Sequence, residues 1–375
     1  MTAHRIETQF AGRPLILESG RLAKQASGSA YLQFGETVVI AAVTVSPHQS
    51  SLPFFPLTVE YREKTYAAGK IPGGFLKREG RPSDKEILAA RGIDRSIRPL
   101  FPEGYKNEVQ VFVTVVSADQ ENDADVLGVV AASLALSVSS VPWGGPIAAV
   151  RVGRVDGNWI LNPTFQQLEF SALDVTVSGS ADSVIMVEGG ALQISEAEML
   201  EALKVAQKGI KELVGHEEKI IAKLSKPKQA WKKDEPDAAL VKKVRALAEG
   251  EMAKAINAKE KHARAASAEA LKVKVAEALA ESFPEAGKQI LSILEDIEYK
   301  VMRAQVLEKG ERVDGRDGDT IRPISIEAGL LPRAHGSALF QRGETQALVA
   351  VTLGTQDDEQ RIDSVHLTIA VDVAG

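Results

Sequence analysis

The chain has 375 residues, no cysteine and a net charge of −6 at pH 7. The absence of cysteine excludes disulfides, thiolate metal ligands and cysteine nucleophiles, and the six histidines are scattered without a zinc-binding HExxH pattern. The N-terminus lacks the apolar segment of a signal peptide, and the longest apolar run, from Val126, is interrupted by serines and short for a membrane span. We therefore expect a cytoplasmic protein with no membrane association.

The first part of the chain mixes expected strands with expected helices. Runs rich in β-branched residues predict strands over residues 30–45, 53–60, 110–116, 147–152 and 173–178. Helical periodicity is found over residues 84–98, after Asp125 and from Ser195 onward, and the first and third of these segments begin with Ser-x-x-Glu capping boxes. This alternation predicts a domain of the α/β (α+β) class, with mixed sheets and helices, over residues 1–225.

A change of composition marks the next part. From about Asp237 to Leu307 the residues are mostly Ala, Glu, Lys and Leu, with few glycines and one proline. We therefore expect an all-helical domain over residues 235–307. Its charges are interpreted as a solvated helix face rather than a specific binding site.

The chain contains an internal duplication. "GSAYLQFGETVVIAAVT" from Gly28 returns as "GSALFQRGETQALVAVT" from Gly336, and residues 26–45 and 334–353 share eleven of twenty identities. Unrelated sequences would share roughly one or two. "RPISIE" also matches the earlier "RPLILE" if one residue is inserted. A repeat distance near 300 residues predicts a duplicated domain, and residues 310–375 are expected to be only the beginning of the second copy.

Residues 62–106 form a basic segment inside this acidic chain. Eleven lysines and arginines face six acids there, which leaves +5. Because affinity for phosphate comes largely from counterion release, such a segment indicates a polyanion site. The basic residues are Arg62, Lys64, Lys70, Lys77, Arg78, Arg81, Lys85, Arg91, Arg95, Arg98 and Lys106.

The stretch "GKIPGGFLKREGRPS" sharpens this prediction. Its glycines favour a mobile loop on which Lys77, Arg78 and Arg81 can follow a phosphate backbone, while Phe75 can stack on a base. It is not a Walker A loop, because no GK[ST] follows. The alternative interpretation is an ordinary charged surface loop.

Three arginines follow on one face of the helix expected over residues 84–98. Arg91, Arg95 and Arg98 are spaced i, i+4 and i+7, with Asp94 near two of them. Intrahelical ion pairs are one interpretation. Because three arginines share one aspartate, two positive charges are left over, and this excess favours a phosphate-facing role.

Two long segments carry a family resemblance. "FFPLTVEYREKTYAAGKIPGGFLKREGRPSDKEIL" and "DRSIRPLFPEGYKNEVQV" resemble the first ribonuclease PH-like (RNase PH-like) domain of the bacterial polynucleotide phosphorylase family. "RVDGRDGDTIRPISIEAGLLPRAHGSALFQRGETQALVAVTLGT" resembles the start of its second such domain, and the helical segment between them also matches. The resemblance extends from the beginning of the chain to about Arg361.

The resemblance implies a polyribonucleotide nucleotidyltransferase. This family degrades single-stranded RNA from the 3′ end by phosphorolysis, with inorganic phosphate as co-substrate, and releases nucleoside diphosphates. It implies a homotrimeric ring with RNA in a central channel, and a role in mRNA turnover within an assembly that contains an endoribonuclease and a helicase.

The resemblance also assigns RNA contacts. The loop with Lys77 and Arg78 matches the family's channel-constriction loop, and the helix arginines match as well. In the second copy, Arg333 and Arg342 match arginines near the RNA path. The sequence departs from many members at Leu76 and Lys77, where they have Phe and Arg, and at Gly92 and Ser96.

In the family, catalysis belongs to the second domain, where a serine-rich loop binds phosphate and an Asp pair with a Lys holds Mg²⁺. The corresponding segments of the first domain contain neither group. Asp174 is a lone carboxylate interpreted as structural, and Asp119, Asp123 and Asp125 are interpreted as turn and first-turn residues.

We therefore expect a degenerate first domain with no catalytic or metal-binding residues, and an inactive chain when it is alone. After Arg361 the sequence departs from the family, and the family's C-terminal RNA-binding modules are not present. The alternative function is a non-catalytic RNA-binding ring or scaffold subunit.

Overall fold

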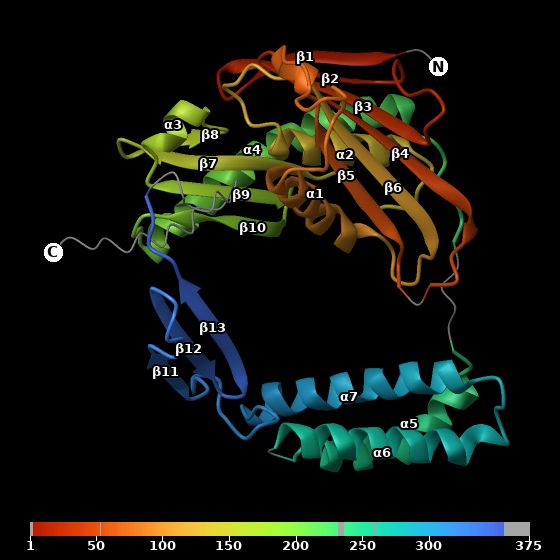
Figure 1. Cartoon of the computed structure of the whole chain (residues 1–375). Coiled ribbons are helices and arrows are strands. Elements are labelled where there is room, and N and C mark those ends of the chain that lie inside the picture. Colours follow the sequence, from red (N-terminus) through yellow and green to blue (C-terminus); the bar gives the residue numbers. More distant parts are fainter. Residues whose placement is uncertain (1–2, 53, 232–235, 259, 356–375) are drawn as a thin grey trace. The chain divides into compact units, whose positions relative to one another are not determined.

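The computed structural model describes residues 3–52, 54–231, 236–258 and 260–355. The chain divides into two compact units, whose described parts are residues 3–231 and 236–355 (Figure 1). No helix in these ranges is long and apolar enough to cross a membrane.

The first unit contains two sheets. In the six-stranded sheet, of order β1-β2-β3-β4-β6-β5, only β5 and β6 are parallel neighbours. The four-stranded sheet is antiparallel, with the order β10-β9-β7-β8. The strands are β1 (His4–Phe10), β2 (Arg13–Ser19), β3 (Gly28–Phe34), β4 (Thr37–Gln49), β5 (Leu57–Glu63), β6 (Asn107–Ser117), β7 (Ala148–Val155), β8 (Asn158–Leu161), β9 (Leu173–Gly179) and β10 (Val184–Ala191).

These strands confirm the expected α/β (α+β) class, although β1, β2, β8 and β10 were not predicted and two of the predicted strands differ in their limits. The strand predicted over residues 30–45 is a hairpin of two strands, because the chain turns at Gly35, which has a φ of +60°. The strand predicted from residue 53 begins later, at Leu57.

Three helices form a layer between the two sheets (Figure 1). α1 (Asp84–Ile97) contacts β5 and β10, α2 (Asp125–Val138) contacts β3, β4, β6 and β7, and α4 (Glu196–Leu224) contacts β1, β2, β7, β8 and β9. The predicted capping boxes are present at the starts of α1 and α4. Shorter helices are η1 (Thr65–Ala68), η2 (Arg98–Leu100) and α3 (Phe165–Glu169).

α2 is buried on all sides. Every residue from Val126 to Val138 is buried, as expected for a helix that is apolar around its whole circumference. The sheets approach it closely: a Cβ atom added to Gly28, the first residue of β3, would lie 2.1 Å from the carbonyl oxygen of Ala135. Only glycine leaves room for this contact.

Polar groups on and beside α2 have partners from distant segments. The Ser133 hydroxyl donates to Glu217 on α4 at 2.7 Å and accepts from the N–H of Ile147 at 2.9 Å. Lys228 satisfies the C-terminal end of the helix, where carbonyl groups lack intrahelical donors. Its Nζ lies 2.9–3.1 Å from the carbonyl oxygens of Leu136, Ser137 and Ser139.

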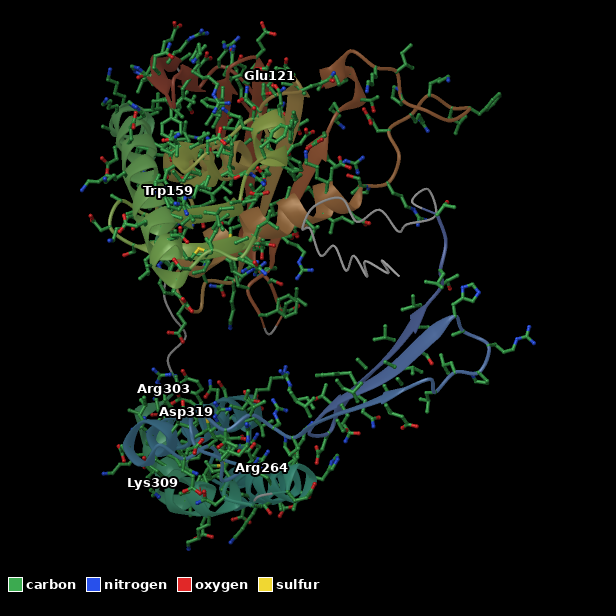
Figure 2. The ribbon with its side chains drawn as sticks, turned by 90° about the vertical axis from the view of Figure 1, so that its left-hand side faces the viewer. Glu121, Trp159, Arg264, Arg303, Lys309 and Asp319 are labelled. Carbon is green, nitrogen blue, oxygen red and sulfur yellow. The ribbon has the colours of Figure 1, made fainter. Side chains whose placement is uncertain are left out.

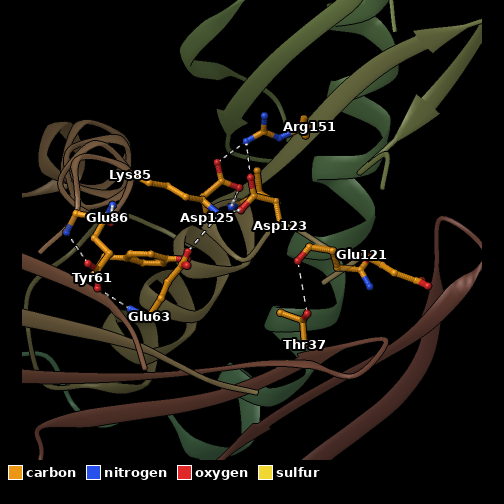
Figure 3. A network of polar contacts seen from close by, with 12 residues as sticks. Thr37, Tyr61, Glu63, Lys85, Glu86, Glu121, Asp123, Asp125 and Arg151 are labelled. Carbon is orange, nitrogen blue, oxygen red and sulfur yellow. Dashed lines mark hydrogen bonds and ion pairs between the residues drawn. The ribbon is translucent and has the colours of Figure 1, made fainter. Parts of the chain in front are cut away.

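An ion cluster surrounds the N-terminal end of α2 (Figure 3). Arg151 on β7 contacts three aspartates, with N–O distances of 3.1 Å to Asp123, 2.6 Å to Asp125 and 2.8 Å to Asp174. Its side chain is only 13% exposed. Burial raises the pKa of Asp125 to about 6, against the opposing effect of Arg151. The guanidinium group is therefore the main counter-charge of this cluster.

Lys85 extends the cluster to α1 and β5. Its Nζ lies 3.2 Å from Asp123 and 3.3 Å from Glu63, and the Tyr61 hydroxyl donates to Glu63 at 2.9 Å (Figure 3). The first turn of α1 is thereby joined to the start of α2. This is the end of α1 that receives the chain from the basic loop.

The second unit begins with three helices, in agreement with the all-helical segment expected from its composition. They are α5 (Ala238–Ala255), α6 (Lys261–Ala280) and α7 (Gly287–Lys309). Apolar side chains from all three form one core, which includes Leu240, Val244, Met252, Leu271, Val275, Ile290, Leu294 and Ile297. Three antiparallel strands follow: β11 (Ile324–Ala328), β12 (Gly336–Arg342) and β13 (Thr345–Val351).

These strands confirm the internal duplication at the level of strand register. In β3–β4, Phe34 pairs with Thr37, and at the equivalent positions of β12–β13, Arg342 pairs with Thr345. The preceding strands pair in the same way, Leu15 with Phe34 and Ile324 with Arg342. The chain between the paired residues Leu15 and Phe34 is one residue longer than the chain between Ile324 and Arg342. The inserted residue therefore lies in the loop between β2 and β3.

The two copies differ in burial. Leu17 on β2 is fully buried, whereas Ile326, its counterpart on β11, is 67% exposed. None of the residues of β11, β12 and β13 is buried. No helix in the described residues covers this sheet as α2 covers β3 and β4. Residues 362–375 of the second copy lie outside the described residues.

The duplication provides a matched pair of substitutions. We expect Gly28→Ala to destabilise the first unit by about 1–3 kcal/mol or more, because the new methyl group would overlap the Ala135 carbonyl of α2. Gly336→Ala, at the equivalent position, should change stability little, since the nearest atom to its Cβ, on Val351, is 3.6 Å away. Urea unfolding of both variants measures the difference, and equal stabilities would contradict this account of the β3–α2 contact.

A second prediction concerns the ion cluster. Arg151→Met should lower the free energy of unfolding at pH 7 by about 3–5 kcal/mol, because it leaves Asp125 and Asp174 without their cationic partner and Asp123 with Lys85 alone. Burial already raises the folded-state pKa of Asp125 to about 6, and removal of Arg151, which acts to lower it, should raise it further. Part of the loss should therefore return as the pH falls from 7 to 5.

The control for this experiment is Lys204→Met. Lys204 pairs with Glu201 on the exposed face of α4, and its loss should cost less than about 1 kcal/mol. Urea unfolding at both pH values is the measurement. A variant of Arg151 as stable as the control, or one that loses further stability on acidification, would disprove the role given to the guanidinium.

Candidate nucleic-acid interface

The predicted basic loop runs from Lys70 to Pro82 and joins η1 to α1. Figure 2 shows this connection extending away from the body of the first unit. Gly69, which ends η1, and Gly74, near the tip, have φ values of +69° and +76°, in the left-handed region that favours glycine. The glycines therefore allow the two sharp changes of direction that carry the loop outward.

The residues of the loop that are predicted to contact RNA are exposed and have no side-chain partner among the described residues. Phe75 is 98% exposed, and its ring is accessible for stacking. Lys77, Arg78 and Arg81 are also exposed, and none has a side-chain hydrogen bond or ion pair within the described part of the chain. Their charges are available to an external anion.

The base of the loop is held by contacts with β5 and η1. The Glu79 carboxylate accepts hydrogen bonds from the N–H of Thr65 at 2.9 Å and from its hydroxyl at 2.8 Å. Arg62 donates to the carbonyl oxygen of Gly80 at 2.9 Å and lies 3.2 Å from Glu86 on α1. The flexible tip therefore rises from a defined base.

The structure separates the three arginines of α1. Arg91 is exposed and has no partner among the described residues. Arg95 forms an ion pair with Glu188 on β10 at 2.7 Å. Arg98 binds Asp94 through two hydrogen bonds, of 2.6 and 2.9 Å.

Arg98 also donates to the carbonyl oxygens of Phe55 and Leu57, at 3.3 and 3.1 Å, and so holds the end of α1 against the start of β5. The prediction that two of the three positive charges are left over is wrong: one is left over, on Arg91. The additional partner, Glu188, comes from a strand far along the chain, which helix spacing cannot reveal.

The two candidate arginines of the second copy belong to the second unit. Arg333 lies in the loop between β11 and β12, and Arg342 is the last residue of β12. Both are exposed and lack a side-chain partner in the described ranges.

The carboxylates that sequence analysis interpreted as structural have structural contacts. Asp119 accepts from the backbone N–H groups of Asn122 and Glu121, at 2.8 and 2.9 Å. Although burial acts to raise its pKa, these bonds lower it to about 2. Asp119 is thus a turn residue and Asp125 a first-turn residue of α2, as predicted.

Sequence analysis missed Arg151, the residue that binds Asp123, Asp125 and Asp174. The available signal was a single arginine inside the apolar strand "AAVRVGRV". Within the described residues, no group of three or more His, Cys, Asp or Glu is arranged to hold a metal ion. These aspartates therefore do not fit a magnesium ion, because a guanidinium group already occupies the space between them.

Comparison with known proteins identifies the parts of the chain. Residues 11–142 and 320–375 match the 3′ exoribonuclease family, domain 1, which agrees with the duplication. Because this match continues to residue 375, the prediction that the sequence departs from the family after Arg361 is wrong. Residues 145–209 match domain 2 of the same family, and residues 239–317 match the RNA binding domain of polyribonucleotide nucleotidyltransferase.

Individual relatives agree with these matches. The chain is 62% identical over 362 residues to the polyribonucleotide nucleotidyltransferase of Gemmatimonas aurantiaca, a match that covers 96% of this chain and 50% of that protein. It is 49% identical to the enzyme of the same name from Geotalea uraniireducens, with 96% and 52% covered. The chain spans about half the length of the curated relatives it matches. Its matched RNase PH-like and helical regions show that it belongs to the polyribonucleotide nucleotidyltransferase family.

Proposed function

We propose that the first unit binds single-stranded RNA through the basic loop, as part of a polyribonucleotide nucleotidyltransferase. The observation that supports this most directly is the exposure of Lys77, Arg78 and Arg81, without internal partners, beside the exposed ring of Phe75. Flexible cations can follow a phosphate backbone without reading its sequence, and an aromatic ring can stack on any base. We therefore expect binding with little sequence preference.

Arg91 extends the proposed surface onto α1, whereas Arg95 and Arg98 contribute to it less, because each already has a carboxylate partner. Arg333 and Arg342 are proposed as additional RNA contacts of the second unit. The match of residues 239–317 to an RNA binding domain supports RNA as the ligand of this protein.

The reaction we propose for the whole protein is phosphorolysis of RNA from the 3′ end to nucleoside diphosphates, with inorganic phosphate as co-substrate and Mg²⁺ as cofactor. Since the aspartates of the first unit are bound to Arg151, we propose that this unit supplies RNA contacts and not the catalytic residues. By family resemblance we further propose a cytoplasmic homotrimer that acts in mRNA turnover with an endoribonuclease and a helicase. The domain limits proposed are 1–225, 235–307 and 310–375.

The second candidate function is that of a non-catalytic RNA-binding scaffold subunit. The occupied carboxylate cluster favours it, because it leaves the described part of the first unit without a group of acids that could bind metal. The two functions share the RNA-binding loop and differ in whether diphosphate is released.

The proposed loop contacts are tested by the triple variant Lys77→Ala, Arg78→Ala, Arg81→Ala. Its affinity for single-stranded RNA should fall for every sequence tested. Each phosphate interaction that the variant removes should flatten the slope of log affinity against log salt concentration by about 0.7. The melting temperature should change little, because these exposed side chains support no other described part of the structure. Fluorescence anisotropy across a salt series, with thermal unfolding alongside, provides the measurement.

A matched control removes the same number of charges elsewhere on the first unit. Lys208, Lys211 and Lys219 are located on α4, away from the loop, and their combined replacement by alanine lowers the net charge equally. If both triple variants weaken RNA binding alike, net charge alone accounts for the effect, and the loop is not the binding site.

A phosphorolysis assay of the purified chain with RNA, phosphate and Mg²⁺ tests whether the first unit is catalytic. We expect no nucleoside diphosphate, because the described aspartates are bound to Arg151 and cannot hold the metal. The full-length Gemmatimonas aurantiaca relative serves as positive control. Phosphate-dependent release by the chain, abolished by Asp174→Asn, would show instead that the first unit is catalytic.

A further inference from the structure

Glu79 is the one side chain between Lys70 and Pro82 that has a hydrogen-bonding partner in the described part of the chain. Both of its carboxylate oxygens accept from Thr65, one from the backbone N–H and the other from the hydroxyl. Thr65 begins η1, which is in turn held to the end of β6 by a 3.0 Å bond from the N–H of Ala118 to the carbonyl oxygen of Ala67. The carboxylate thus joins the loop to a fixed part of the first unit.

The tip of the loop has no comparable support. Between Ile71 and Arg78 the described contacts include one weak backbone bond, from the N–H of Lys77 to the carbonyl oxygen of Gly74 at 3.4 Å. Without an anchor, the cations of the tip would sample many positions. Ordering them on RNA would then cost conformational entropy that a pre-positioned loop does not lose.

Apart from its contact with Thr65, the negative charge of Glu79 is unfavourable for binding a phosphate backbone at this loop. It directly follows Arg78 and precedes Arg81 by two residues, so it brings a negative charge next to the proposed phosphate contacts. Acceptance of the two bonds from Thr65 lowers the pKa of Glu79, so the carboxylate is ionised at neutral pH. A surface carboxylate with no other role here would weaken RNA binding, because it would repel the phosphate groups.

We propose that Glu79 is a positioning residue for RNA: its contact with Thr65 holds Lys77, Arg78 and Arg81 in the conformation that receives the phosphate backbone. This inference rests on the proposed function of the loop. Glu79 itself does not touch the RNA. It affects RNA affinity indirectly, by ordering the neighbouring side chains Lys77, Arg78 and Arg81.

The sign of the effect separates positioning from simple electrostatics. Glu79→Ala removes a negative charge from a site for a polyanion, and by charge alone it should strengthen binding. We expect the reverse, an affinity for single-stranded RNA reduced by about threefold to tenfold, since the variant lacks two hydrogen bonds that select the binding conformation. The slope of log affinity against log salt should stay at the parent value, because all three cations that contact phosphate remain.

Thr65→Val tests the same contact from the other side. It removes the hydroxyl donor at nearly constant shape, keeps the backbone N–H, and changes no charge and no residue of the loop. We expect it to weaken RNA binding without altering the salt slope. The double variant should be little weaker than Glu79→Ala alone, because both substitutions break one contact. Glu60→Ala, which removes an exposed acid from β5, is the matched charge control and should leave binding unchanged or slightly stronger.

Loop order provides a readout independent of RNA. Both variants should show faster amide hydrogen exchange over residues 70–82 and faster tryptic cleavage after Lys77 and Arg78, at an unchanged melting temperature. RNA binding by Glu79→Ala that equals or exceeds the parent's would overturn the positioning role, and so would additive effects of the two substitutions. If the triple loop variant binds RNA as the parent does, the proposed function of the loop fails. If the triple variant is weak and Glu79→Ala is not, only the inference about Glu79 fails.

Discussion

The burial of α2 is the constraint on which the first unit depends. Because this helix is apolar on every side, one sheet cannot cover it, and the unit places sheets on two sides with α1 and α4 beside it. Close packing follows, and it is most stringent where β3 begins at Gly28 against the carbonyl group of Ala135. Two sets of polar groups at the helix gain partners from distant segments: the Ser133 hydroxyl binds Glu217, and the carbonyl groups at the C-terminal end bind Lys228.

The same helix connects the core to the proposed binding surface. Its N-terminal end carries Asp125, and the cluster around Arg151 continues through Asp123 and Lys85 to the first turn of α1. The loop enters α1 at this turn, and its base is held by Arg62 and Glu79. A rigid support with a flexible tip suits a surface that must hold a polymer of variable sequence, because the support fixes where the charges are while the tip adapts to each nucleotide.

The duplicated strands show what a sheet requires beyond its own hydrogen bonds. β11, β12 and β13 repeat the register of β2, β3 and β4, so the local sequence is sufficient to specify pairing and the position of the turn. The apolar face of the first copy is covered by α2, whereas none of the strand residues of the second copy is buried. Strand pairing and burial of the sheet are thus separate requirements. Burial depends on a helix that comes from outside the paired strands.

The sequence by itself determined several strands and the three long helices of the first unit, the helical segment, the duplication with its single inserted residue, and the exposed basic loop. These features depend on periodicity, capping and composition, which act over a few residues. Tertiary structure alone decided which charges remain available for a ligand. Arg95 is paired because β10 places Glu188 beside it, and the aspartates near α2 are neutralised because β7 places Arg151 among them. An ion pair depends on distance in space, and spacing along the chain fixes that distance only within a single helix or strand.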